Sequence, residues 1–279
     1  WEAVEEVSAR VRPAGGVLSE WRFIESHPVL CRERSTDDGG RAVVSAENVA
    51  RGVCVLKERA FAFVTTPNCA VCLRRAKRRC GCGTRWCSSA CQEKDDHPCA
   101  ALDLLRRLES ERDESSCLAD FDALRLATRL WTSGKTKTEE FLRLCDHREV
   151  LVDAARRGDV CAERILASAH VGATLVATSL RCDDDESQLV LSLLKIRFNA
   201  FPVALVEMGT SLSLFLRASA FNHSCSPNSS LSIHPSTDDT LVFEARVHVD
   251  FLCRGMELTI SYLSLQALLS EKRRETLRE

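Results

Sequence analysis

Two stretches of this chain carry side chains that can bind or transform a ligand. The first is the string 222–228, which reads Asn-His-Ser-Cys-Ser-Pro-Asn. It gathers amides, an imidazole, hydroxyls and a thiol, and Pro227 restricts its backbone. Alternating apolar runs at 212–216 and 241–247 flank it, so we predict that it lies at the end of a strand, against a sheet. The same string also suits an Asx-type turn whose side chains bond their own backbone, and composition leaves both interpretations open.

The second stretch is rich in thiols. The chain has 15 cysteines, and seven of them lie between residues 69 and 99. Such clustering, in a chain whose first residues lack the pattern of a secretory signal, indicates metal ligation in a reducing compartment rather than a disulfide framework. The candidate ligands are Cys69, Cys72, Cys80, Cys82, Cys87, Cys91, His97 and Cys99. Thiolate and imidazole ligands in this number suffice for two tetrahedral sites, and zinc is the metal that prefers them.

The spacing within this cysteine cluster differs from pair to pair. Cys69-x2-Cys72 is the familiar chelating turn, and Cys87-x3-Cys91 places two sulfurs one helical turn apart. Those two pairs predict a structural zinc site. Cys80-Gly81-Cys82 and His97-Pro98-Cys99 are tighter and predict a second site less directly. Because protein side chains fill all four coordination positions of each metal, we expect closed, structural sites. Metal binding would then stabilise the fold of this segment of about thirty mostly polar residues.

A group of cations, all between two cysteines of the cluster, comprises Arg74, Arg75, Lys77, Arg78 and Arg79. These cations suit contact with phosphate, including nucleic acid, or with an acidic partner, and they equally suit a solvated loop between metal ligands. The whole chain gives nucleic-acid binding little support, because 38 Lys and Arg residues face 40 Asp and Glu residues. No apolar run approaches the ~20 residues of a membrane span, so we predict no membrane partner.

Elements of two kinds must position these groups. Alternation of apolar and polar residues predicts short strands, and apolar residues recurring every three to four positions predict helices between residues 100 and 197. The predicted strands include 41–46, 53–56, 60–64 and 257–262, and the predicted helices include 139–155, 160–180 and 187–198. At 279 residues the chain can bury one large core or two smaller ones. The predicted fold class is α+β, with a sheet domain split by two insertions.

With these motifs in place, the chain resembles the SET and MYND domain family of protein-lysine methyltransferases, in which a MYND zinc finger interrupts a SET fold. The resemblance covers about residues 29–279, and its most specific parts are the string 222–228, the finger 69–99 and the segment 255–262. It implies a SET-type β-sheet domain interrupted by a MYND-type zinc finger and a helical insertion.

The resemblance also implies domain boundaries. They are an unassigned lead segment 1–28, the N-terminal SET part 29–68, the MYND-type finger 69–99, a helical insertion 100–195, the C-terminal catalytic SET part 196–263 and a helix 264–279. In the family a Cys-x-Cys-x2-Cys post-SET segment then brings a further zinc. This chain reaches Glu279 without it, so we expect a fragment in which Cys225 lacks its zinc-binding companions.

The metal pairing that the resemblance implies is interleaved. One zinc would be held by Cys69, Cys72, Cys87 and Cys91, and the other by Cys80, Cys82, His97 and Cys99. The spacing of the cysteines by itself does not specify that pairing.

The activity that the resemblance implies is methyl transfer from S-adenosylmethionine to a lysine of a histone tail or another protein. The expected cofactor contacts are Gly40, Arg41, Asn199, Asn222 and His223. Methyl transfer from a sulfonium to an amine is an in-line displacement, so alignment of the two reactants is the enzyme's main task. A narrow apolar channel would also lower the pKa of the attacking lysine by desolvation.

Two aromatic residues complete the implied site. Phe201 would form a wall of the lysine channel, and Tyr262, the only tyrosine of the chain, would direct its hydroxyl to the reacting amine. The alternative for Tyr262 is a strand tyrosine whose ring fills the core. Ala42 departs from the family's Gly-x-Gly loop, and Met256 stands where the family has a carboxylate before Glu257.

The alternative function is a non-catalytic MYND adaptor that binds Pro-rich peptides, with the SET part as an inactive scaffold. For either function the reduced cysteines predict a nuclear or cytoplasmic location. The sequence does not specify the target lysine, the number of methyl groups or the oligomeric state.

Overall fold

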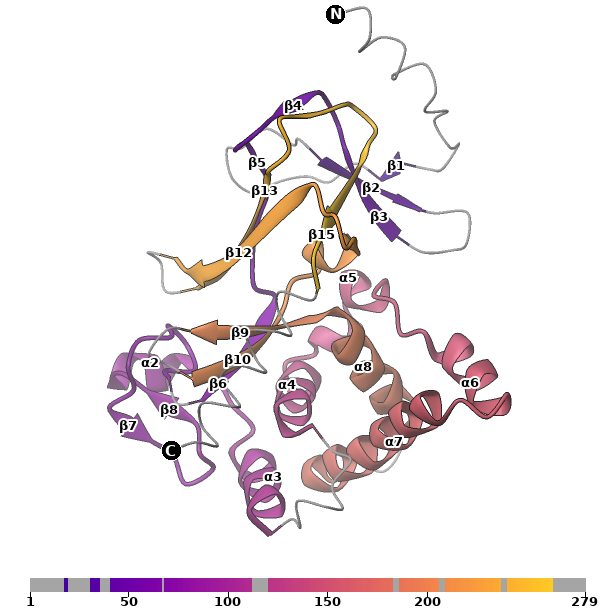
Figure 1. The fold of residues 1–279 in the computed structure, drawn as a ribbon. Helices are drawn as coiled ribbons and strands as arrows, with labels where there is room; N and C mark the ends of the chain where they lie inside the picture. Colours follow the sequence, from indigo (N-terminus) through magenta and orange to yellow (C-terminus); the bar gives the residue numbers. More distant parts are fainter. Residues whose placement is uncertain are drawn as a thin grey trace, which may run out of the picture. The chain divides into compact units, whose positions relative to one another are not determined.

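The computed structural model describes residues 18–19, 31–35, 41–66, 68–111, 120–182, 186–205, 209–236 and 240–262. The chain divides into two compact units (Figure 1). Unit 1 comprises Trp1–Arg59, Arg217–His234 and Val242–Glu279, and unit 2 comprises Ala60–Leu216 and Pro235–Leu241. Short sheets in both units and helices concentrated in unit 2 confirm the predicted α+β class.

Unit 1 is built of small sheets. Its largest sheet has the strand order β1-β2-β3-β15-β11. These strands are β1 (Leu18–Ser19), β2 (Cys31–Ser35), β3 (Arg41–Ser45), β15 (Glu257–Ile260) and β11 (Asn222–His223). The pairs among β1, β2, β3 and β15 are antiparallel, whereas β11 runs parallel to β15. A parallel pair requires a crossover, which here contains the strands between residues 223 and 257.

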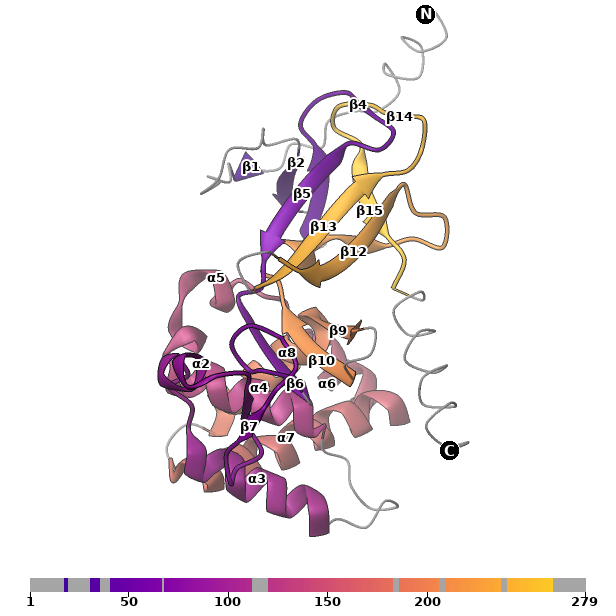
Figure 2. The same cartoon turned by 90° about the vertical axis from the view of Figure 1, so that its left-hand side faces the viewer.

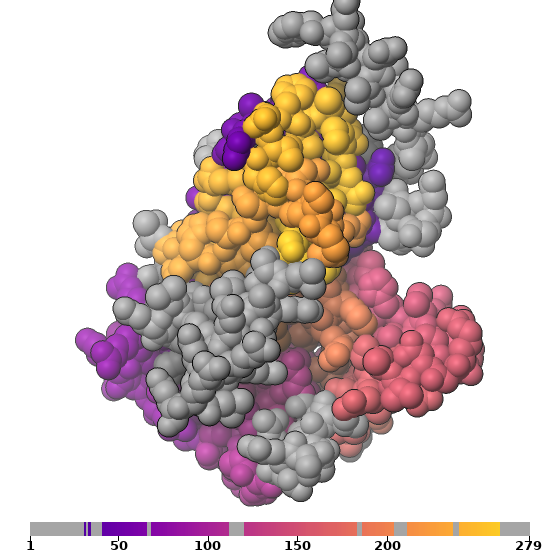
Figure 3. All heavy atoms as spheres, viewed as in Figure 1, coloured from indigo at the N-terminus to yellow at the C-terminus, as the bar shows by residue number. Residues whose placement is uncertain are grey.

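A second sheet has the order β12-β13-β5, and its three strands lie side by side in Figure 2. They are β12 (Ser229–Pro235), β13 (Leu241–Val247) and β5 (Cys54–Arg59), and a small pair joins β4 (Val49–Ala50) to β14 (Phe251–Leu252). The central strand β13 is buried at nearly every position, as expected of a strand covered on both faces. In the space-filling view, the residues of β12 to β15, coloured orange to yellow, gather on one continuous surface (Figure 3).

Unit 2 contains a three-stranded antiparallel sheet of order β6-β10-β9. The strands are β6 (Ala62–Thr66), β10 (Gly209–Leu214) and β9 (Ala200–Leu205). Pro202 has no N–H to donate, and it lies in β9, which is an edge strand. The cysteine-rich insertion contributes the hairpin of β7 (Arg78–Arg79) and β8 (Arg85–Trp86), followed by the short helix α2 (Ser89–Lys94).

The rest of unit 2 is helical. The helices are α3 (Cys99–Glu111), α4 (Phe121–Thr132), α5 (Glu139–Leu142), α6 (Arg148–Arg156), α7 (Val160–Leu180) and α8 (Glu186–Asn199). Asp120 and Asp159 begin α4 and α7, and each side chain accepts hydrogen bonds from two backbone N–H groups of the first turn. Helix α7 packs against α3, α4, α6 and α8. A Cβ atom at Gly172 of α7 would lie 2.8 Å from Leu124 of α4, so glycine permits this close approach.

The predicted elements agree with the structure in part. The helix predicted at 160–180 is confirmed as α7, whereas the helix predicted at 139–155 is wrong, because residues 143–147 separate α5 from α6. His147 adopts a left-handed backbone with φ 53° there, which ends helical periodicity. The strand predicted at 257–262 ends at Ile260, and that predicted at 60–64 is shifted to β6. The lead segment 1–28 lies mostly, and the helix 264–279 wholly, outside the described residues.

Helix α7 is long and apolar enough to cross a membrane by length and composition alone. The prediction that no apolar run approaches the length of a membrane span missed this helix, in which Glu163 and Arg164 interrupt the apolar residues of the first turns. Its residues Ala169, Ala173 and Val176 are buried in the core shared with α4 and α8. A core helix of a helical block has these properties without any membrane, so the helix is weak support for a membrane span.

Candidate functional site

The string 222–228 is held against β15 at both of its ends. Its first residues form β11, with Asn222 opposite Thr259 and His223 opposite Ile260. At its far end the Asn228 side chain donates to the Glu257 carbonyl (2.7 Å) and accepts from the Thr259 N–H (2.9 Å). Between these ends Ser226 N–H donates to the Ser224 hydroxyl at 3.1 Å. The string therefore combines the two interpretations of its sequence, a strand and a short side-chain-bonded turn.

His223 is oriented by the chain that follows β15. The Tyr262 N–H donates to His223 Nδ1 at 3.0 Å, and the centroids of the two rings are 5.4 Å apart. Because Nδ1 accepts a hydrogen bond, the neutral imidazole carries its proton on Nε2. Cys225 Sγ lies 3.4 Å from Nε2, within reach of that proton.

The hydroxyl of Tyr262 points to the main chain beside the string. It donates to the Phe221 carbonyl at 2.5 Å. Burial raises the pKa of the Tyr262 phenol above its ordinary value, while the positive charge of Arg41 acts in the opposite direction. Tyr262 is therefore a protonated hydrogen-bond donor near neutral pH.

Asn222 links three strands of the largest sheet in unit 1. Its Nδ2 donates to Glu257 Oε1 (2.8 Å) on β15 and to the Arg41 carbonyl (3.1 Å) on β3. The Arg41 guanidinium donates to the Ser219 hydroxyl at 3.0 Å and lies 3.5 Å from Glu33. Of the predicted site residues, unit 1 thus brings together Arg41, Asn222, His223 and Tyr262, while Gly40 lies outside the described residues.

Sequence reasoning did not assign a role to Glu257, although it lies in the segment 255–262 that carries the resemblance. Its carboxylate accepts the hydrogen bond from Asn222 Nδ2 at 2.8 Å. The signal that could have identified Glu257 is its position in the strand β15. It lies two residues before Thr259, which is opposite Asn222 in the β11–β15 pair.

The other two predicted site residues, Asn199 and Phe201, belong to unit 2. Asn199 ends α8 and is 5% exposed, and its Nδ2 donates to the carbonyls of Cys145 and Lys195, both at 2.7 Å. Phe201 on β9 is buried edge-to-face against Phe215, with ring centroids 6.0 Å apart. Their assignments to the cofactor and to the lysine channel stay predictions.

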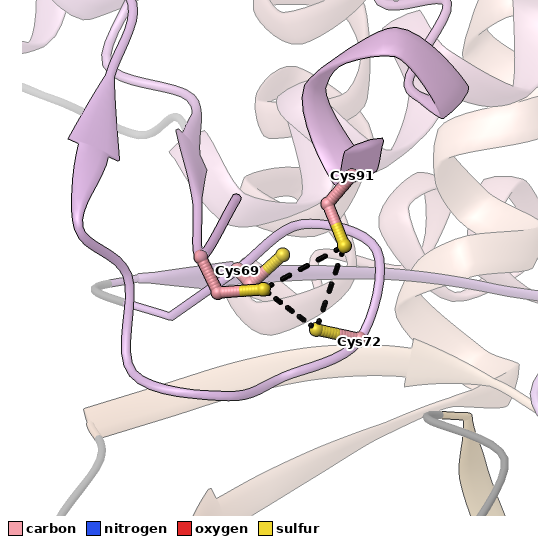
Figure 4. A group of neighbouring side chains, drawn as sticks. Cys69, Cys72 and Cys91 are labelled. Atoms are coloured by element: carbon pink, nitrogen blue, oxygen red, sulfur yellow. Dashed lines mark hydrogen bonds between the residues drawn. The ribbon is translucent and has the colours of Figure 1, made fainter. Parts of the chain in front are cut away.

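The cysteine cluster forms two groups. The first consists of Cys69, Cys72, Cys87 and Cys91, whose sulfur atoms all lie within 4.8 Å of one another. Figure 4 shows the sulfurs of Cys69, Cys72 and Cys91 turned toward a common centre. The Sγ–Sγ distances are 3.3 Å for Cys72–Cys87, 3.6 Å for Cys87–Cys91 and 3.8 Å for Cys91–Cys72. Zinc–sulfur bonds of about 2.3 Å in a tetrahedron require sulfurs about 3.8 Å apart, so this group fits zinc.

The second group consists of Cys80, Cys82, His97 and Cys99, with ligand atoms again within 4.8 Å of one another. Gly83, with φ 94°, closes the turn that places Cys80 and Cys82 together, and its N–H donates to the Cys80 carbonyl at 3.0 Å. His97 Nδ1 lies 3.2 Å from the Asp95 carbonyl, whereas Nε2 is buried with no hydrogen-bond partner among the described residues. A buried imidazole nitrogen left in this way fits a metal ligand.

The thiols of the second group differ in acidity. The backbone hydrogen bond from Cys82 lowers the pKa of the Cys80 thiol to about 6. The hydrogen bond with Cys80 raises the pKa of Cys99 to about 12. The hydrogen bond between the two sulfurs thus favours one shared proton, and a bound divalent cation would allow both sulfurs to be thiolates.

The two groups are the same interleaved sets that the resemblance implies. The interleaving arises because the β7–β8 hairpin folds back: Lys77 N–H donates to the Trp86 carbonyl and Ala70 N–H to the Arg85 carbonyl, both at 2.8 Å. Cys87 thereby returns to the Cys69–Cys72 turn, while Cys80 and Cys82, in the hairpin loop, lie by the start of α3.

No protein-family model matches the chain, and no curated protein matches it in sequence. Among solved structures, the chain is similar to the SET domain of LSMT, which was solved bound to lysine and AdoHcy. The TM-score is 0.50 and the sequence identity 10%, over 85% of this chain and 50% of that chain. The chain therefore spans about half the length of the structure that it matches. At this identity the similarity shows the fold alone, which is SET-like, and the two cysteine-rich groups are compatible with a zinc-finger insertion.

Proposed function

We propose that this chain is an S-adenosylmethionine-dependent protein-lysine N-methyltransferase of the SET and MYND type, acting on a histone or another protein. The observation that carries the proposal is the parallel pairing of β11 with β15, which sets Asn222, His223 and Tyr262 side by side. The similarity to a SET domain bound to lysine and AdoHcy supports the same activity. A nuclear or cytoplasmic location is part of the proposal.

The residues of unit 1 suit the charges of the cofactor. S-adenosylmethionine carries a carboxylate, an ammonium group and a sulfonium, so its binding site must offer groups of both signs. Glu257 provides a negative group bonded to Asn222, and Asn222 and His223 are both exposed. Arg41, whose carbonyl accepts from Asn222, provides a positive group that contacts Ser219 and Glu33. In our proposal Asn222, His223 and Arg41 hold the cofactor, and Glu257 faces its positive groups.

The chemistry that the cofactor supplies is an electrophilic methyl group on sulfur. The protein's own contribution is to align the lysine amine with that methyl group and to keep the amine neutral. In our proposal the Tyr262 hydroxyl, which donates its proton to the Phe221 carbonyl, presents its oxygen to the reacting amine. The two zinc ions of the finger are structural, because four protein ligands leave no open position for chemistry.

Calorimetric titration of the full chain with S-adenosylmethionine tests the proposal. We expect saturable binding that is weakened by His223→Ala and retained by His234→Ala, a half-exposed histidine on β12 of the same unit. A chain that carries its zinc yet has no affinity for the cofactor would overturn the enzyme proposal. Binding of a Pro-rich peptide by such a chain would then favour the non-catalytic adaptor.

A further inference from the structure

Asp95 is a buried carboxylate placed between the second metal group and the helical block. Its side chain is 7% exposed and follows the short helix α2. It accepts a hydrogen bond from Trp86 Nε1 at 2.9 Å, and it pairs with Arg129 of α4 through Nη1 (2.8 Å) and Nη2 (3.3 Å). Burial of a charged carboxylate is unfavourable unless hydrogen bonds and a counter-charge replace the lost water. Trp86 of β8 and Arg129 of α4 provide these interactions and fix the position of Asp95.

His97 takes its orientation from Asp95. Its Nδ1 lies 3.2 Å from the Asp95 carbonyl and 3.5 Å from the Asp95 carboxylate, and its ring lies 5.2 Å from the Trp86 ring. With Nδ1 directed at Asp95, the buried Nε2 is the nitrogen left for the metal. Carboxylates that bond the far nitrogen of a metal-binding imidazole fix its tautomer and its orientation.

Arg129 is the partner that comes from outside the metal-binding segment. It lies 34 residues beyond Asp95 in the chain, on α4, with its side chain 20% exposed. Its two nitrogens bind the two carboxylate oxygens, a fork geometry that fixes a carboxylate more tightly than a single cation does. The neighbouring residues Leu126, Ala127 and Leu130 of α4 are buried in the core of unit 2.

We propose that Asp95 and Arg129 are positioning residues of the second metal site, and that through them metal binding is coupled to the packing of α4. Arg129 holds the Asp95 carboxylate, and Asp95 holds the imidazole of His97 toward the cysteines. The coupling is reciprocal by thermodynamic necessity, so a metal bound by His97 also stabilises the position of Arg129 and α4. This inference rests on the zinc part of the proposed function.

Arg129→Met tests the inference, and Arg125→Met is its matched control. Arg125 lies one turn earlier on α4 with a side chain 19% exposed, and it pairs with Glu109 and Asp122 rather than with the metal-binding segment. Both substitutions remove a partly buried ion pair from the same helix. Only Arg129→Met is expected to weaken the second site, by about 10- to 100-fold in zinc affinity, as is typical of losing an outer-shell partner.

The measurement is chelator competition on the zinc-loaded full chain, followed by alkylation and peptide mapping of the exposed thiols. In Arg129→Met we expect Cys80, Cys82 and Cys99 to be labelled at lower chelator concentration than in the wild type. Labelling of Cys69, Cys72, Cys87 and Cys91 should not change. Arg129→Lys, which keeps the charge but not the fork, should restore part of the zinc affinity.

Two results would overturn the inference. The first is equal zinc retention at the second site in Arg129→Met and Arg125→Met, and the second is equal hydrogen exchange in α4 before and after zinc removal. A wild-type chain that holds no zinc under native mass spectrometry would instead contradict the zinc part of the proposed function. The failure of one proposal is thus distinguishable from the failure of the other.

Discussion

The main chain of Tyr262 is hydrogen-bonded to the side chain of His223. The Tyr262 N–H donates to His223 Nδ1 at 3.0 Å, while the Tyr262 hydroxyl donates to the carbonyl of Phe221, two residues before His223. The tyrosine therefore bonds the start of the string 222–228 at two points. In this arrangement a change at Tyr262 alters the string as well as the hydroxyl, and the experiments must separate the two effects.

Replacing Tyr262 with phenylalanine, with cofactor affinity and methyl transfer measured separately, tests the hydroxyl while the backbone hydrogen bond to His223 stays in place. Tyr262→Phe keeps the backbone hydrogen bond to His223 and the aromatic ring but removes the hydroxyl. We expect cofactor affinity near that of the wild type and methyl transfer reduced by about 100-fold or more, the usual loss for a group that acts on the reacting atoms. Calorimetry and methylation of a peptide array measure the two quantities. Full methyl transfer by this variant would remove Tyr262 from the catalytic site.

The phenol of Tyr262 should titrate above the ordinary range of tyrosine. Burial raises its pKa and the Arg41 charge opposes the shift, so Arg41→Met should raise the pKa further. Since the chain has a single tyrosine, the ultraviolet absorbance of the phenolate reports this group alone. A midpoint at or below that of a denatured sample would contradict the burial of the hydroxyl.

The same shift predicts the effect of alkaline pH on stability. The pKa of Tyr262 in the folded state lies above its pKa in the unfolded state. At a pH between the two values, the folded state therefore binds more protons than the unfolded state. The stability that the protonated phenol contributes is fully present below the unfolded pKa and is lost as the pH rises through the folded pKa. We expect the wild type to lose more stability than Tyr262→Phe above about pH 10, measured by denaturant unfolding.

Asn222 and Asn228 should differ in what their removal costs. Asn222 is exposed and bonds the Glu257 carboxylate, whereas Asn228 bonds the main chain of β15 twice. We expect Asn222→Ala to weaken cofactor binding by about 10- to 100-fold, since a hydrogen bond to a charged group contributes about 1.5–3 kcal/mol. Asn228→Ala should instead lower the free energy of unfolding by about 1–3 kcal/mol. Calorimetry measures the cofactor affinity of both variants, and denaturant unfolding measures their stability. If Asn222→Ala lost mainly stability and Asn228→Ala mainly cofactor affinity, the assignment of Asn222 to the cofactor would be contradicted.

Zinc removal should unfold the finger in two separable steps. Native mass spectrometry of the wild type should show two ions, one for each group of ligands. Cys69→Ser should lose one ion and Cys99→Ser the other, because a tetrahedral site that loses a thiolate ligand binds zinc far more weakly. Cys161→Ser, at an exposed cysteine of α7, is the control and should keep both ions. One ion in the wild type would contradict the second site.

Much of the local structure could be predicted from the sequence. Helix α7 occupies the predicted range 160–180, because its apolar spacing and its Asp159 cap depend only on neighbouring residues. Strand β13 occupies the apolar run 241–247, although its burial at nearly every position was not predicted by alternation. Residue type and spacing also mark the cysteines of 69–99 and His97 as candidate metal ligands, and the structure gathers them into two groups. Where local signals compete, as at residues 143–147, the prediction of one continuous helix was wrong.

The sequence by itself determined which residues are candidate soft metal ligands and where most of the helical and extended segments lie. Only the tertiary structure decided that Asn222 meets Glu257, and that Asp95 meets Arg129, 34 residues away. The physical reason is range: periodicity and chelate spacing act within a few residues, whereas these contacts form only once a parallel strand pair or a packed helix has been assembled. The candidate metal-binding residues can thus be identified from local sequence, whereas the residues that orient them are brought close only by the tertiary fold.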